Sequence, residues 1–152
     1  MDLVTEVFPW EKLCTRYPEL SRDTLTLPWE ERCRSHSRRS TDSGVAFALS
    51  LDSGSVLSAG SGMLLESQKL LVEVCEAEEA VYSITPASAQ DAAYLAYQIG
   101  NRHLALMIRE SGLFCLAEPA ARLLFEQLHV SFDETSTPFT PAIKFSGHTH
   151  TH

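Results

Sequence analysis

Several features of familiar protein classes are missing from this 152-residue sequence. No apolar run approaches the roughly 20 residues that cross a bilayer. The N-terminus carries Asp2 and Glu6 where a secretory signal carries basic residues. Basic residues are scarce overall, since 12 Lys and Arg stand against 20 Asp and Glu for a formal net charge of −8. These absences argue against membrane and nucleic-acid binding, and we expect a soluble cytoplasmic protein.

Cysteine and catalytic motifs are equally sparse. The four cysteines, Cys14, Cys33, Cys75 and Cys115, lie far apart without a CxxC pair, which argues against a zinc ribbon or a dense disulfide framework. The sequence also lacks a GxSxG turn, a GxxxxGK(S/T) phosphate loop and an HExxH motif. We therefore expect a protein that is not an enzyme. A hydrolase built from Cys115 and His103 stays open as an alternative, although no local motif supports it.

Short strand-like runs fill the first half of the chain. Residues 3–8, 24–27, 45–51 and 70–75 are β-branched or alternate in polarity, and Gly, Ser and Asp lie between them. This pattern predicts a small all-β domain over residues 1–75. Within it, the stretch 29–39, with its four arginines, is expected to form a strand with one charged face.

The pattern changes after the acidic residues 76–79. Ser88 and Asp91 have the spacing of a capping box, and Pro119 suits the first position of a second helix. The expected elements are a strand at 80–84, a helix from Ser88 that stops at Gly100, strands at 104–108 and 113–116, a helix opened by Pro119 and a strand at 130–133. This βαββαβ order predicts an α+β protein with a ferredoxin-like domain over residues 76–134.

Three of the six histidines, His148, His150 and His152, fall within the last five residues. Residues 135–152 are rich in Pro, Ser and Thr, so we expect a disordered tail. Alternate residues of an extended segment point the same way, and HxHxH can therefore offer two or three imidazoles to one divalent ion. A solvated tail without ligands is the open alternative.

His103 is the second candidate ligand. It follows a Gly-Asn-Arg turn after the first expected helix, which predicts an exposed position at the start of a strand. A structural surface histidine is the alternative. One imidazole holds a divalent ion weakly, whereas two copies across a two-fold axis hold it better. His36 lies among arginines and His129 ends a helix, so solvation and the helix dipole explain these two.

Residues 93–103, which read AYLAYQIGNRH, resemble the UreE family of urease accessory proteins, which are nickel metallochaperones. Residues 25–34 are similar to the family's L-T-L-P-W-E-x-R-x-R element. They are followed by a TDSG turn at 41–44 and a GSVL segment at 54–57. Residues 138–141, PFTP, match the P-F-x-P that precedes a histidine-bearing tail. These matches cover most of the chain in the family's order.

The resemblance implies a nickel-binding protein that delivers Ni²⁺ for assembly of the urease active site. It implies a β domain for protein contacts, and a homodimer whose ferredoxin-like domains bind the ion between the two copies of His103. His148, His150 and His152 would add ligands. The implied partners are the urease accessory GTPase and apo-urease. Zn²⁺ or Cu²⁺ are expected to compete in vitro.

Two departures limit what the resemblance implies. Leu116, Ala117 and Pro119 stand where some members carry extra histidines, and residues 142–145 read AIKF where the family usually has E-x-G-A-Y. With few imidazoles available, we expect one or two ions per dimer and no bulk storage. Two other functions stay open: a protein-interaction module that binds an extended peptide on a sheet edge, and a zinc or copper buffer on the same fold.

Overall fold

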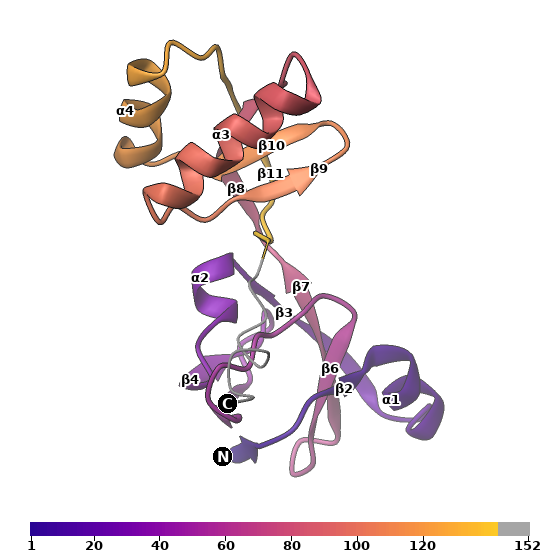
Figure 1. The fold of residues 1–152 in the computed structure, drawn as a ribbon. Helices are drawn as coiled ribbons and strands as arrows, with labels where there is room; N and C mark the ends of the chain where they lie inside the picture. Colours follow the sequence, from indigo (N-terminus) through magenta and orange to yellow (C-terminus); the bar gives the residue numbers. More distant parts are fainter. Residues whose placement is uncertain (143–152) are drawn as a thin grey trace, which may run out of the picture. The chain divides into compact units, whose positions relative to one another are not determined.

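The structure, a computed structural model, describes residues 1–142 of the chain. Contacts divide it into two compact units, the first from Met1 to Ala77 and the second beginning at Glu78. Each unit combines β-sheet with two short helices, so the fold is mixed α/β and mostly sheet (Figure 1). Within the described residues, no helix is long and apolar enough to cross a membrane.

Two sheets enclose the apolar core of the first unit. Their strand orders are β1-β5-β4 and β2-β6-β7-β3. Phe47 and Leu49 alternate with outward residues along β5, and they share one buried cluster with Met63 and Val72 of the other sheet. The elements of this unit are β1 (Asp2–Val4), β2 (Phe8–Pro9), α1 (Trp10–Arg16), β3 (Ser21–Leu27), α2 (Trp29–Arg32), β4 (His36–Ser40), β5 (Ala46–Ser50), β6 (Ser61–Leu65) and β7 (Leu70–Glu76).

The expectation of an all-β first domain is wrong, because α1 and α2 interrupt the strands. The stretch 29–39 is a helical turn followed by β4 and does not form a single strand. Arg32 explains the difference, since its side chain is 1% exposed and does not lie on a charged face. Its Nη1 lies 3.4 Å from a Glu76 carboxylate oxygen, and its Nε donates to the Leu27 carbonyl at 3.2 Å. A buried guanidinium requires such partners.

The second unit has one four-stranded sheet in the order β11-β8-β10-β9, with all neighbours antiparallel. Both of its helices pack on the same face, because Leu95 of α3 and Phe125 of α4 share a buried cluster with Tyr82 and Cys115 of the sheet. In Figure 1 α3 lies across this sheet. The elements are β8 (Glu78–Ile84), α3 (Ala89–Asn101), β9 (Met107–Arg109), β10 (Gly112–Leu116), α4 (Pro119–Gln127) and β11 (Asp133–Pro138).

Both predicted helix starts in this unit are confirmed. The Ser88 hydroxyl accepts the Asp91 N–H at 3.0 Å, and the Asp91 carboxylate accepts the Ala87 N–H at 2.9 Å. Two donors at the start of α3 are thereby satisfied. Pro119 is the first residue of α4, where its missing N–H costs nothing.

The predicted bounds of the other helix and strand ends in the second unit are less accurate. Gly100 lies inside α3 and does not end it, and β9 begins at Met107 instead of residue 104. The last strand is Asp133–Pro138 and not 130–133, so the disordered tail expected from residue 135 does not begin there. Phe139, next along the chain, is fully buried. The polar sequence of β11 lacks the apolar pattern of a predicted strand. Its extended conformation comes from antiparallel pairing with β8.

Gly112 offers a test of the tight turn between β9 and β10. Its φ is +147°, and a Cβ at this position would lie 2.4 Å from the Ile84 carbonyl oxygen. We expect Gly112→Ala to lower the free energy of unfolding by about 2 kcal/mol in urea denaturation. Gly100→Ala is the control, since open space surrounds that helical position, and it should raise stability by about 0.5–1 kcal/mol. Equal stability of the two variants would contradict the clash.

Candidate metal centre

His103 lies in the turn that ends α3, and not at the start of a strand. The Leu104 N–H donates to the Ile99 carbonyl at 3.3 Å, and the His103 N–H donates to the Gly100 carbonyl at 3.0 Å. This pair of hydrogen bonds is a Schellman motif, in which the residue after the C-cap is left-handed. His103 occupies that position with a φ of +57°. Its side chain is exposed to solvent.

A left-handed backbone is unusual for histidine. Glycine normally occupies this position because a Cβ costs roughly 1–2 kcal/mol there. His129 repeats the arrangement after α4: its φ is +55°, and the Val130 N–H donates to the Phe125 carbonyl at 3.0 Å. Because both helices end in this way, the backbone alone does not distinguish His103. Any difference between His103 and His129 must therefore come from the residues around them.

The C-terminal half of α3 carries two exposed aromatic side chains. Tyr94 and Tyr97 are 52% and 67% exposed, and they share a helix face with Asn101, two residues before His103. Arg102 turns away and donates to the Gln127 side-chain oxygen of α4 at 3.2 Å. The helix that leads into the His103 turn therefore carries exposed aromatic surface, which is unusual on a helix facing solvent.

The described part of one chain does not gather a set of ligands around His103. Residues 1–142 contain no group of three or more His, Cys, Asp or Glu side chains that could hold a metal ion. The predicted ligands His148, His150 and His152 lie outside the described residues. His36 belongs to the first unit, where its Nδ1 lies 3.0 Å from the Ser35 hydroxyl. Within the described part of one subunit, a metal centre at His103 is therefore incomplete.

Three of the four cysteines are poor candidates to complete it. Burial raises the pKa of the Cys115 thiol to about 12, and burial likewise raises the pKa values of Cys33 and Cys75. Because thiolate is the species that binds metal and reacts, protonated thiols at neutral pH do neither efficiently. Cys115 also lies in the core cluster under α3 and α4. The hydrolase alternative with Cys115 as nucleophile therefore has no structural support.

The segment after β11 is held next to the turn that carries His103. The Ala142 N–H donates to the Leu106 carbonyl at 2.6 Å, and the Thr140 N–H lies 3.4 Å from the Met107 sulfur. Arg109 fixes the start of this segment by donating to the Thr137 hydroxyl at 3.2 Å and to the Pro138 carbonyl at 3.1 Å. Ala142 is thus hydrogen-bonded to Leu106, which lies three residues after His103 in the sequence.

Sequence reasoning missed this anchor. Arg109 directly follows the expected strand at 104–108 and belongs to no motif, and only the PFTP stretch at 138–141 marks the segment as distinctive. The guanidinium also makes a cation–π contact with Phe114, whose ring centre lies 5.7 Å away. Three contacts from one side chain therefore connect β9, β10 and the end of β11.

Comparisons with known proteins match both units. A family described as the N-terminal domain of the UreE urease accessory protein matches residues 12–76, and one described as its C-terminal domain matches residues 79–152. A urease accessory protein UreE from Chelativorans is 31% identical over 84% of this chain and 84% of its own length. Relatives of the same name from Burkholderia orbicola and Azorhizobium caulinodans are 33% and 31% identical over 85% and 82% of the chain. The chain spans 63% and 59% of these two relatives.

The thiol environments give a direct test. At pH 8 we expect iodoacetamide to alkylate exposed Cys33 in the folded protein, while Cys115 stays unmodified because its pKa of about 12 leaves almost no thiolate. Mass spectrometry of peptides after a timed reaction measures this. Unfolding in urea should make the two sites react at similar rates. Rapid labelling of Cys115 in the folded protein would show that the core around it opens.

Proposed function

This chain belongs to the UreE family of urease accessory proteins, and from that premise we propose that it is a nickel carrier which delivers Ni²⁺ for assembly of the urease active site. It acts by binding and release and not as an enzyme. The observation that carries the proposal is the exposed imidazole of His103 on the turn that directly follows α3, the helix that also exposes Tyr94 and Tyr97.

A homodimer completes the site. An isologous interface places the same residue opposite itself, so two copies of His103 supply two neutral nitrogens to one ion. The exposed rings of Tyr94 and Tyr97 support this arrangement, because they provide aromatic surface for a subunit contact on the helix that precedes His103. Two nitrogens leave most of the coordination sphere open, and the ion can therefore pass to an acceptor.

The tail histidines His148, His150 and His152 act as additional ligands in this proposal. The anchor at Ala142 supports it, since six residues from there to His148 span at most about 20 Å and ten residues to His152 at most about 33 Å. The Leu106 carbonyl that holds Ala142 is three residues from His103, or at most about 10 Å along the backbone. The tail imidazoles are thus within reach of the same ion.

The two units have different roles in this proposal. We infer that the second, which begins at Glu78 and includes β11 to Pro138, is a ferredoxin-like domain for metal binding and dimerisation, which the strand order β11-β8-β10-β9 with both helices on one face supports. The first, from Met1 to Ala77, makes contacts with proteins in this proposal. The proposed partners are the urease accessory GTPase and apo-urease, which receive the ion.

His103→Gly separates the metal role from the structural one. Glycine suits a φ of +57°, so we expect this variant to be more stable than the wild type by about 1 kcal/mol, while nickel affinity falls at least about tenfold. His129→Gly is the matched control, with the same gain in stability and unchanged nickel affinity. Calorimetric titration and thermal denaturation measure the two properties. Unchanged affinity in His103→Gly would overturn the interface site, and the same titrations with Zn²⁺ and Cu²⁺ report selectivity.

The Arg109 anchor predicts a conditional effect. Arg109→Ala should weaken nickel binding by about 3- to 10-fold in the full chain, because the tail ligands lose effective concentration near His103. In a chain truncated after Gly147, which lacks all three tail histidines, the same substitution should have no effect on affinity. An equal loss in both backgrounds would show that Arg109 acts on the fold of the unit and not through the tail.

A further inference from the structure

β3, the end strand of its sheet, has one edge that no strand of the described chain pairs with. All seven of its residues, Ser21–Leu27, pair with β7 on the other side. Unpaired N–H and C=O groups on such an edge are a template for pairing with another chain. A long edge of this kind therefore needs protection if the folded protein is to avoid sheet-to-sheet association.

The loop that connects β4 to β5 covers the middle of this edge. The carboxylate of Asp42 accepts the Thr26 N–H at 3.1 Å and the hydroxyls of Thr24 and Thr26, both at 2.6 Å. The Asp42 N–H donates to the Thr24 carbonyl at 2.8 Å. Ser43 adds a hydrogen bond from its hydroxyl to the Asp23 carboxylate. Five hydrogen bonds thus hold one loop against the edge of β3.

These hydrogen bonds use the same backbone groups that an added strand would use. Asp42 binds the Thr24 C=O and the Thr26 N–H, and both groups therefore point away from β7. The Thr24 N–H donates to the Asp23 carboxylate at 2.7 Å. A strand that approached β3 would have to break these bonds before it formed its own.

Negative charge on the same edge adds to the barrier. Burial raises the pKa of Asp42, but hydrogen bonds from Thr24 and Thr26 outweigh it and hold the pKa below the usual carboxyl value. For Asp23, burial is likewise outweighed, chiefly by the hydrogen bond from Ser43, and its pKa is also lowered. Both carboxylates are therefore charged at neutral pH. Charged groups on an edge disfavour an added strand.

The loop keeps its shape through hydrogen bonds of its own. Thr41 is buried, its hydroxyl accepts the Val45 N–H at 3.0 Å, and its N–H donates to the Val45 carbonyl at 3.0 Å. The Gly44 N–H donates to the Thr41 carbonyl at 2.9 Å, with a φ of +97° that glycine adopts without strain. None of these bonds involves β3. The loop is thus a preformed part of the β4–β5 hairpin that contacts the other sheet.

We propose that residues 41–44 form an edge guard, which keeps β3 from pairing with β3 of a second copy of this chain. In the association that the guard prevents, two copies of β3 run antiparallel about a two-fold axis and exchange hydrogen bonds through Thr24 and Thr26. A loop that only tied the two sheets together would affect stability alone. The inference goes beyond the proposed nickel role and does not depend on it.

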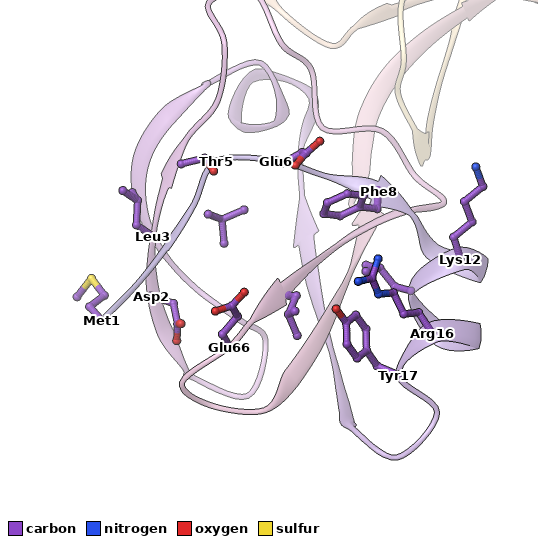
Figure 2. Close-up of a pocket in the computed structure, with 13 residues that line it drawn as sticks. Met1, Asp2, Leu3, Thr5, Glu6, Phe8, Lys12, Arg16, Tyr17 and Glu66 are labelled. Carbon is purple, nitrogen blue, oxygen red and sulfur yellow. The ribbon is translucent and has the colours of Figure 1, made fainter.

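Asp2 supplies a matched control in the same unit. Its carboxylate accepts the Ser67 N–H at 3.0 Å and also the Ser67 hydroxyl. Figure 2 shows Asp2 near Glu66, among the residues that line a pocket of about 700 Å³. Ser67 lies in the turn between β6 and β7 and not in a strand. Loss of the Asp2 carboxylate therefore removes hydrogen bonds of the same kind but uncovers no strand edge.

The experiment measures the mass of full-length variants by sedimentation velocity over a concentration series. Asp42→Ala removes three of the five hydrogen bonds, and Asp42→Ala combined with Ser43→Ala removes four. We expect Asp42→Ala to associate as its concentration rises, and the double variant to associate more strongly, into species of at least twice the wild-type mass. Ser43→Ala alone and Asp2→Ala should keep the wild-type mass at every concentration.

Thr26→Pro locates the association. Proline is tolerated on an edge strand where its missing N–H would point away from the sheet, and the Thr26 N–H points to Asp42. Added to the double variant, Thr26→Pro removes a donor that the second copy needs and should restore the wild-type mass. The proposal is wrong if the double variant keeps the wild-type mass, if Asp2→Ala associates as strongly, or if association persists with Thr26→Pro.

Hydrogen exchange of the wild type tests the guard without any substitution. The Thr26 amide should exchange as slowly as amides paired within the sheet, because the Asp42 carboxylate binds it. Asp42 is exposed and the loop keeps its own bonds, so Asp42→Ala should fold. In dilute solution of this variant the Thr26 amide should exchange at least about tenfold faster. Rapid exchange of Thr26 in the wild type would overturn the proposal, since the loop would then not hold the edge.

Discussion

The candidate metal centre depends on one backbone constraint, the left-handed turn that closes α3. A side chain at a φ of +57° costs free energy that glycine avoids, but the N–H groups of His103 and Leu104 satisfy the last carbonyls of the helix. The backbone that carries the imidazole is thereby held in a short hydrogen-bonded turn, while the side chain stays exposed. An exposed donor on such a turn binds an ion without enclosing it, which is what the proposed role as a carrier requires.

What the sequence predicted well is local chemistry. Ser88 with Asp91 and Pro119 placed two helix starts because side-chain capping and the geometry of proline act within one turn of the chain. The order of elements in the second unit follows from the same signals. The exposed histidine after α3 was also identified in advance, since the Gly-Asn-Arg-His stretch is local and distinctive.

Three of the missed features depend on partners distant in sequence. Arg32 is buried with Glu76, 44 residues away, as a partner, whereas the expected strand would have placed it on an exposed charged face. β11 has almost no apolar side chains, and its pairing with β8 decides its conformation. Arg109 likewise meets Thr137 only in the folded unit. No periodicity in the sequence records such contacts, so neither the last strand nor the anchor of the tail could be read from it.

The pairing of β3 with β7 has a consequence for synthesis on the ribosome. These strands are parallel, from Ser21 with Leu70 to Leu27 with Glu76, and the Ala77 N–H donates to the Leu27 carbonyl. The first unit therefore lacks one of its central strands, and the partner of buried Arg32, until its final residues have emerged. Because long-range parallel pairing is slow, we expect this unit to complete its fold while the second is already being translated. Its apolar strands are exposed to solvent during that interval.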